Sequence, residues 1–231
     1  MKLTLTLTAN AGVLLRFGEN GPVYGVDALP DTKVSDFSTL SAEQIETTFS
    51  LLDETPPTAL LTTHDHDDHY SRKLLDKAAE RYTGCRVITP WAEPEKKGRI
   101  YIINDQTITA IPLPHRLAPD VPECDNYAFV IETGGKSVFL PGDAEPFGEE
   151  MTELAQSFHP DAAVLPFVWA ILPRCRRVLD ILAPKAAAFM HLPFEEEDSR
   201  GYNHVTNQAA RLYYPSSVVL NKHLQRVEFE L

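Results

Sequence analysis

The sequence predicts an α/β fold formed by one domain spanning residues 1–231. The pattern is typical of two β-sheets between layers of helices, but strand counting alone does not separate this layout from other α/β arrangements. Short apolar or alternating segments typical of strands recur along the whole chain. Segments with helical spacing lie between them rather than in a separate block. A hydrophobic content of 43%, with no linker or low-complexity segment, is enough for one well-packed core.

The first half of the chain predicts five strands and two helices. Leucine and threonine alternate strictly over residues 3–8, as in a strand with one buried face. Residues 18–21, Gly-Glu-Asn-Gly, are typical of a hairpin turn. Ser71 is suited to cap the second helix, because a serine hydroxyl can accept from an orphan backbone N–H. The expected elements are strands at 3–8, 12–17 and 22–26, a helix from 41, a strand at 58–62, a helix from 71 to about 81 and a strand at 86–89.

The second half predicts seven more strands alternating in part with helices. Thr133-Gly134-Gly135 is typical of the turn of a β-hairpin. Strands are expected at 99–104, 106–112, 126–132, 136–140, 162–165 and 186–190, and a last one at 225–230. Helices are expected at 147–158 and 173–182, with a short helix near 205–212.

Charge and cysteine content narrow the class of partner. The chain has 33 acidic and 21 basic residues, a net charge of −12, which disfavours a nucleic-acid-binding surface. The widely spaced Cys85, Cys124 and Cys175 contain no Cys-x-x-Cys pair and are expected to be free thiols of a reducing compartment. The N-terminal alternation lacks the continuous apolar core of a signal peptide, and no run reaches transmembrane length. We expect a cytoplasmic protein with a small-molecule substrate and no nucleic-acid or membrane partner.

The most informative segment is the loop after the strand at 58–62. Residues 64–69 contain three histidines and three carboxylates, in the pattern His-x-His-x-Asp-His. The pattern is formed by His64, His66, Asp68 and His69. Imidazole and carboxylate are the usual ligands of zinc and related divalent metals. A solvated acidic loop is the alternative, but this density of ligand types favours a metal site at the carboxyl end of a strand.

Three further metal-capable side chains each follow an apolar, strand-like run. They are His115 after 106–112, Asp143 in Leu140-Pro141-Gly142-Asp143, and His191 after 186–190. The repetition of one arrangement, a polar ligand at the end of an apolar strand, predicts that all seven side chains serve one purpose. Seven protein groups are too many for one tetrahedral ion and suit two ions that share a solvent molecule.

In this order and spacing the residues resemble the metallo-β-lactamase superfamily, and the resemblance covers roughly residues 1–231. It implies a four-layer αββα sandwich and two divalent metal ions, zinc first, with manganese or iron as alternatives. His64, His66 and His115 would hold one ion, Asp68, His69 and His191 the other, and Asp143 would bridge them. Oxygen-reducing diiron relatives carry Glu where His66 stands, so imidazole here favours hydrolysis.

The resemblance also implies a mechanism, in which a metal-bound hydroxide attacks a small ester, lactone or phosphodiester. Asp68 and Asp143 are the carboxylates expected to act in catalysis, Asp143 by orienting the hydroxide and carrying its proton. Thr62, Asp65 and Glu145 are candidates for orienting the imidazoles, with a simple turn role as the alternative for each.

The substrate is less closely defined. The segment 161–166 is similar to the branch that contains the ascorbate-phosphate lactonase, but Phe167-Val168-Trp169-Ala170 stands where such relatives have a glycine-rich loop. Arg116 could meet a substrate anion or form a surface salt bridge. Trp169, together with Trp91, Phe194 and Tyr70, could line a pocket or serve packing. His204, in an expected loop, could reach substrate or be solvated.

Two other functions stay open from the residues alone. One is a metal-stabilised binding or sensing protein without turnover. The other is a nucleic-acid phosphodiesterase, against which the acidic charge weighs. The sequence also leaves open whether the chain forms a homo-oligomer.

Overall fold

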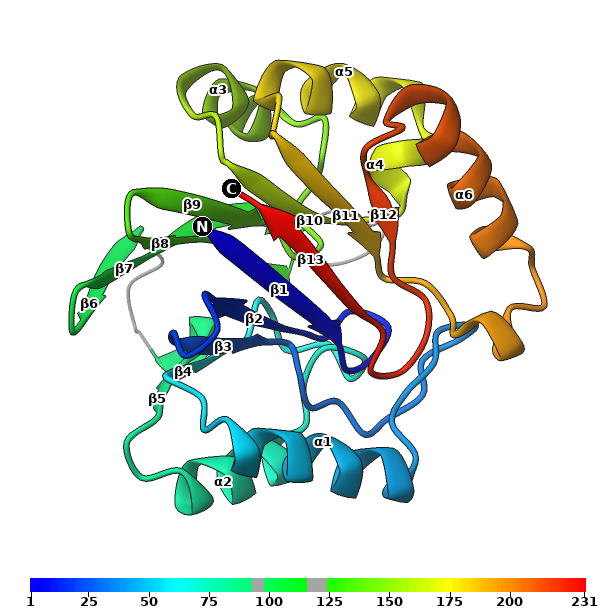
Figure 1. The fold of residues 1–231 in the computed structure, drawn as a ribbon. Helices are drawn as coiled ribbons and strands as arrows, with labels where there is room; N and C mark the ends of the chain where they lie inside the picture. Colours follow the sequence, from blue (N-terminus) through cyan, green and yellow to red (C-terminus); the bar gives the residue numbers. More distant parts are fainter. Residues whose placement is uncertain (93–97, 116–123) are drawn as a thin grey trace. The chain divides into compact units, whose positions relative to one another are not determined.

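The computed structural model describes residues 1–92, 98–115 and 124–231. The chain is divided into two compact units, each built around one β-sheet (Figure 1). The first unit comprises Met1–Ala92, His191–Asn203 and Leu220–Glu230, and the second comprises Glu93–Met190, His204–Val219 and Leu231. The single domain expected from the sequence stays a prediction. Among the described helices, none has the length and apolar character needed to cross a bilayer.

The first unit has a six-stranded sheet in the order β13-β1-β2-β3-β4-β5. Its strands are β1 (Lys2–Leu7), β2 (Val13–Phe17), β3 (Val23–Val26), β4 (Ala59–Leu61), β5 (Arg86–Ile88) and β13 (Arg226–Glu230). β13, β1, β2 and β3 pair antiparallel, whereas β3, β4 and β5 pair parallel. The parallel part brings the carboxyl ends of three strands to the same edge, where α/β proteins commonly build sites.

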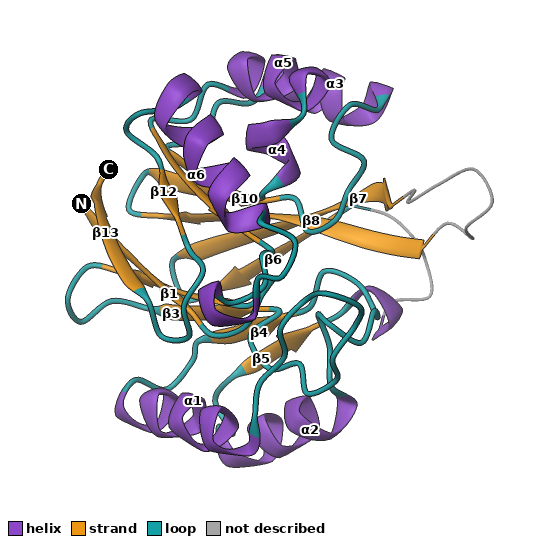
Figure 2. Ribbon diagram, turned by 90° about the vertical axis from the view of Figure 1, so that its right-hand side faces the viewer, coloured by secondary structure: helices purple, strands orange, loops and turns teal. Residues whose placement is uncertain are grey.

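Helices α1 (Ala42–Glu54) and α2 (Arg72–Arg81) lie side by side on this sheet (Figures 1 and 2). Ser41 caps α1 in a capping box with Gln44, and Ser71 caps α2 by accepting from the backbone N–H of Leu74. The helices bury apolar faces against the sheet in one cluster. Its members include Leu14, Phe49, Leu52, Leu60, Leu74 and Ala78.

The second unit has a seven-stranded sheet in the order β12-β11-β10-β9-β8-β7-β6. Its strands are β6 (Arg99–Ile103), β7 (Gln106–His115), β8 (Cys124–Thr133), β9 (Lys136–Leu140), β10 (Ala162–Pro166), β11 (Ala186–Met190) and β12 (Val218–Val219). Gly134 and Gly135 form the turn between β8 and β9 with positive φ angles of 57° and 74°, which explains the two glycines.

Among the described residues four helices accompany this second sheet, and α3 and α5 run next to one another (Figures 1 and 2). They are α3 (Glu149–Ser157), α4 (Val168–Ile171), α5 (Pro173–Leu182) and α6 (Tyr202–Tyr213). Phe139, Leu165, Leu179 and Phe189 belong to the core between the helices and the sheet. Two short 3₁₀ helices, η1 (Pro90–Ala92) and η2 (Glu195–Glu197), complete the described elements.

The structure confirms the predicted elements to within a few residues and adds α4 and β12. The short helix expected near 205–212 is α6, which begins at Tyr202, so His204 lies in its first turn and not in a loop. β7 is longer than expected and runs through Pro112 and Pro114 to His115. Within the described residues β6 pairs with β7 only as far as Ala110, so neither proline has to donate to β6.

Candidate metal centre

The loop with the His-x-His-x-Asp-His pattern joins β4 to α2 in the first unit. The carbonyl of His66 accepts from the backbone N–H groups of His69 at 2.9 Å and Tyr70 at 3.0 Å, which closes a tight turn. Asp68 and His69 lie in this turn, between the end of β4 and the start of α2. Both side chains are buried, with 6% and 3% of their residue surface exposed, although they are polar. Buried polar groups need partners, so their surroundings reveal their role.

Asp68, His69 and His191 form a buried group in which one ligand atom from each lies within 4.8 Å of the others. The Oδ2 atom of Asp68 lies 3.3 Å from His191 Nε2 and 3.9 Å from His69 Nε2. The shorter distance suits a metal, since two donors about 2.0–2.2 Å from a tetrahedral zinc ion lie about 3.3–3.6 Å apart, whereas the longer one lies outside this range. The structure therefore gathers the three residues that the resemblance assigned to one ion.

Asp27 orients His69 from behind, and the sequence reasoning missed it. Its Oδ2 atom accepts a hydrogen bond from His69 Nδ1 over 2.9 Å. A carboxylate has no hydrogen to give, so Nδ1 carries the ring proton and Nε2 keeps its lone pair for a metal. Asp27 directly follows β3 and has a left-handed backbone with φ of 49°, a conformation that Asp tolerates better than most residues. Of the residues expected to orient imidazoles, Asp65 is exposed instead.

Thr63 extends the same control to His64. Its hydroxyl donates to Asp27 Oδ2 over 2.7 Å, and its backbone N–H donates to Oδ1 over 2.8 Å. The hydroxyl hydrogen is thereby used, so Thr63 Oγ1 must accept from His64 Nδ1, which lies 2.9 Å away. His64 Nε2 is then the unprotonated nitrogen, as a metal ligand must be.

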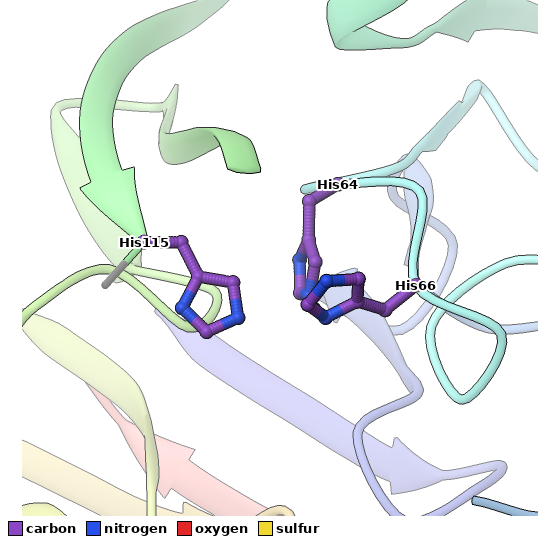
Figure 3. Close-up of side chains that lie close together, drawn as sticks. All are labelled: His64, His66 and His115. Carbon is purple, nitrogen blue, oxygen red and sulfur yellow. The ribbon is translucent and has the colours of Figure 1, made fainter. Parts of the chain in front are cut away.

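His64 and His66 turn toward one another on the loop after β4 (Figure 3). His64 Nε2 lies 3.1 Å from His66 Nδ1, close to the separation of about 3.3 Å expected for two imidazole nitrogens on a tetrahedral zinc ion. His64 is fully buried and His66 is partly buried. The donor set of the first unit, four imidazoles and a carboxylate, therefore fits divalent zinc in type, and the His64–His66 separation fits it in spacing.

His191 is fixed by its backbone as well as by its ring. Its φ of 60° is left-handed, and its N–H donates to the carbonyl of Asn10 over 2.7 Å. Asn10 is fully buried, and its Nδ2 lies 3.5 Å from Asp68 Oδ2. Strained backbone of this kind persists where surrounding contacts determine it, and it clusters at functional sites. The turn after β1 thus positions two members of the candidate site.

Phe37 stacks on the His191 ring, with ring centroids 4.6 Å apart and an interplanar angle of 15°. The sequence reasoning assigned this residue nothing. The segment around Phe37 is held to the segment after His191 by three polar contacts. These are Lys33 to Glu197 at 2.7 Å, Phe194 N–H to Ser38 at 2.8 Å and Arg200 to Asp36 at 3.1 Å. Phe37 therefore forms a fixed, partly exposed aromatic wall beside a candidate ligand.

In the second unit, His115 and Asp143 are brought together. His115 ends β7 (Figure 3), and its Nε2 lies 3.9 Å from Asp143 Oδ2. Asn126 supports the turn that carries Asp143, because its amide donates to the Pro141 carbonyl over 3.0 Å and accepts from the Asp143 N–H over 3.2 Å. Gly142, with φ of 58°, supplies the left-handed residue that this turn requires.

The residues proposed to meet substrate have different surroundings. Trp169 is fully buried in the core of the second unit, which favours the packing alternative. Phe194 is likewise fully buried, whereas Trp91 is 41% exposed and contacts Tyr70 with ring centroids 4.6 Å apart. His204 is exposed on the first turn of α6. Arg116 lies outside the described residues.

The chain was compared with known proteins. No curated protein sequence matches it significantly. A structure of the metallo-β-lactamase fold protein YhfI from Bacillus subtilis matches 99% of this chain and 100% of its own, with a TM-score of 0.63 and 13% identity. The metallo hydrolase Igni18 from Ignicoccus hospitalis matches 100% of both chains, with a TM-score of 0.63 and 18% identity.

A third structure, the diiron β-hydroxylase CmlA from Streptomyces venezuelae, matches 99% of this chain and 54% of its own, with a TM-score of 0.61 and 15% identity. Matches over nearly the whole chain confirm the predicted fold class. The family model described as "Beta-lactamase superfamily domain" matches residues 36–179, more than half of the sequence. The chain therefore belongs to the β-lactamase superfamily, within the metallo-β-lactamase fold.

Proposed function

We propose that this protein is a metal-dependent hydrolase that cleaves a small ester, lactone or phosphodiester. In this proposal it uses two divalent metal ions, of which zinc is the preferred one. One observation carries the proposal. Asp68, His69 and His191 converge in a buried group, and the Asp27 carboxylate holds His69 in the tautomer that leaves Nε2 for a metal. An assembly of this kind has no value for packing, because buried polar groups cost stability unless they are satisfied.

The remaining candidate ligands complete a second set in this proposal. His64 and His66 already present facing nitrogens 3.1 Å apart. His115 and Asp143 are proposed to join them, on the strength of the ligand order in the sequence and of the family to which the chain belongs. The resulting seven ligands match in number what two ions with a shared solvent molecule require.

A bound divalent ion lowers the pKa of coordinated water and polarises a carbonyl or phosphoryl oxygen. The residues of this chain would supply the rest. Asp143 would accept the proton of the attacking water at a carboxylate oxygen. The side-chain amide of Asn10 donates to Asp68 Oδ2 and so fixes the position of that carboxylate. Phe37 closes one side of the site with an apolar surface, which orients substrate and excludes water.

The metallo hydrolase Igni18 supports hydrolysis as the reaction class, whereas CmlA is a diiron hydroxylase on the same fold. His66 favours hydrolysis for this chain, because imidazole is a common zinc ligand, whereas oxygen-reducing diiron relatives carry Glu at this position.

The test combines metal analysis with a substrate panel. Protein purified without chelators is analysed by inductively coupled plasma mass spectrometry, together with His66→Ala, His69→Ala and Asp143→Ala. His159→Ala serves as the matched control, since His159 Nδ1 contacts only the Leu182 carbonyl, at 3.2 Å, in the described hydrogen bonds. Lactone, thioester and phosphodiester substrates are then assayed with zinc, manganese and iron.

The wild-type chain and the control should hold about two equivalents of metal and hydrolyse one substrate class. The three ligand variants should lose metal and activity while retaining the far-UV circular dichroism of the fold. Unchanged metal content in all three variants would refute the site. Full metal loading with no hydrolysis across the panel would instead indicate a metal-stabilised binding protein.

A further inference from the structure

The first unit also contains a pocket away from the candidate ligands, and none of its lining residues belongs to the candidate metal centre. Its volume is about 240 Å³, enough for a small organic molecule. It opens between the sheet and the carboxyl end of α1, with Leu51 and Thr55 on the helix side. Leu14, Val23 and Leu224 give its walls an apolar character.

Strand alternation explains why polar groups form its floor. Leu3 and Leu5 of β1 are fully buried on one face of the sheet, so Thr4 and Thr6 point to the other. Arg16 of β2 lies opposite Thr4 and therefore stands on the same face. Strands β1 and β2 thus supply two threonine hydroxyls and a guanidinium to the pocket, beside the apolar side chain of Leu14.

Arg16 is the unusual group in this pocket. It is partly buried, and its Nη2 donates to Thr55 Oγ1 over 3.3 Å. Its Nε is shielded from solvent and has no acceptor among the described residues. In residues 1–92, 98–115 and 124–231, no carboxylate lies within ion-pair distance of Arg16, although the chain carries a net charge of −12. Charged groups that are removed from water are normally paired with an opposite charge, so the partly buried guanidinium of Arg16 has capacity to bind an anion.

Arg226 adds a second cation at the rim. It lies opposite Thr6 in the pairing of β13 with β1, and its Nη2 bonds Glu228 Oε1 at 2.6 Å. The lining itself contains two arginines and no acidic residue. Guanidinium groups match carboxylate and phosphate groups in geometry and charge, and apolar walls accommodate hydrocarbon.

We propose that this pocket binds a small organic anion, with a carboxylate or phosphate head on Arg16 and an apolar body against the leucine side chains. The site is separate from the metal centre and does not depend on the proposed hydrolysis. Thr4 and Thr6 are placed to donate hydroxyl hydrogens to the same head group.

The test is isothermal titration calorimetry of the full metal-loaded chain with hexanoate, hexyl phosphate and hexanol. One of the two anions should bind saturably with one molecule per chain, and the better of them identifies the head group. Neutral hexanol should bind far more weakly. Arg16→Gln should weaken anion binding by about tenfold or more, whereas Arg211→Gln, which changes an exposed arginine on α6, should leave it unchanged.

Two further variants keep the result decisive. Thr6→Phe, which fills the pocket and retains Arg16, should weaken anion binding at least as much, and it replaces Arg16→Gln if that variant fails to fold. His69→Ala should leave anion binding intact, since a carboxylate captured by a metal ion would be lost there. Binding that survives both Arg16→Gln and Thr6→Phe, or no saturable binding of either anion, would overturn the proposal and leave Arg16 as a partner of the α1 carboxyl end only.

Discussion

The Oδ2 atom of Asp27 lies 2.9 Å from His69 Nδ1 and 2.7 Å from the Thr63 hydroxyl, so one carboxylate oxygen fixes the protonation of two imidazoles, those of His69 and, through Thr63, His64. Neither imidazole can rotate or change tautomer without breaking a buried hydrogen bond. The geometry of the candidate ligands is therefore set by a residue that coordinates nothing itself.

Replacing Asp27 by Asn should weaken metal binding by about 10- to 100-fold, because the amide can present N–H where His69 Nδ1 needs an acceptor. Competition with a chromophoric zinc chelator measures the affinity. Asp31→Asn, an exposed change in a nearby loop, is the matched control. Equal affinities in the two variants would mean that Asp27 is purely structural.

Gly12→Ala should destabilise the first unit. A Cβ at this position would lie 2.5 Å from the Asp27 carbonyl and 2.6 Å from Thr8 Oγ1, so the backbone of Asp27 has to shift. A cost of about 1–3 kcal/mol in the free energy of unfolding is expected, together with weaker metal binding. Urea unfolding measures the first. Gly84→Ala, whose Cβ would meet nothing within 4 Å, should be close to neutral, and a similar loss in both variants would contradict this account.

Ser41→Ala should cost about 1 kcal/mol of stability, because it removes the hydroxyl that accepts from the Gln44 N–H and dismantles the capping box of α1. Thermal and urea unfolding give the value. Ser50→Ala on the exposed part of the same helix removes only a hydroxyl bonded to the Glu46 carbonyl and should be neutral or slightly stabilising. If the two variants behaved alike, the cap would have no energetic weight.

Asp161 should make stability pH-dependent in acid. The hydrogen bond from Lys185, with further help from the Ser137 N–H and Lys136, lowers its pKa from 3.8 to about 2. The folded pKa lies below the unfolded one, so the contribution is complete above pH 3.8 and is lost as the pH falls through about 2. At neutral pH, Asp161→Asn should cost about 1–2 kcal/mol.

Urea unfolding of the Asp161→Asn variant at neutral pH and near pH 2 checks this account, and the gap to the wild-type chain should narrow in acid. Glu153→Gln on the exposed face of α3 is the control and should show no such change. A gap that stayed constant with pH would show that the lysine contacts do not stabilise the fold.

Local signals explain which elements the sequence could predict. Ser41 and Ser71 mark the starts of α1 and α2 in the sequence, because each capping residue is followed within a few positions by apolar residues at helical spacing. The full length of β7 could not be predicted from its own residues, because it depends on how β7 pairs with β6 and β8. Pro112 and Pro114 read as strand breakers, and only the pairing partner on each side of β7 shows that they are tolerated there.

The candidate site was predictable where ligands form a pattern and unpredictable where a single residue acts over distance. His64, His66, Asp68 and His69 lie in one loop, so their meaning is local. Asp27 offered the same signal as Asp143, an acid at the end of an apolar strand, but without a flanking motif it could not be told from a turn residue. Phe37 lies in an irregular segment, and only the folded chain brings it to His191.

The contact between the His191 N–H and the Asn10 carbonyl joins two points separated by most of the chain. A ribosome must therefore synthesise at least the first 191 residues before the three-ligand group of Asp68, His69 and His191 can exist. The three ligands come together only when the segment of His191 has packed against the segment of Asn10. A metal can therefore meet all three ligands only after this long loop has closed, which couples metal binding to the last stage of folding.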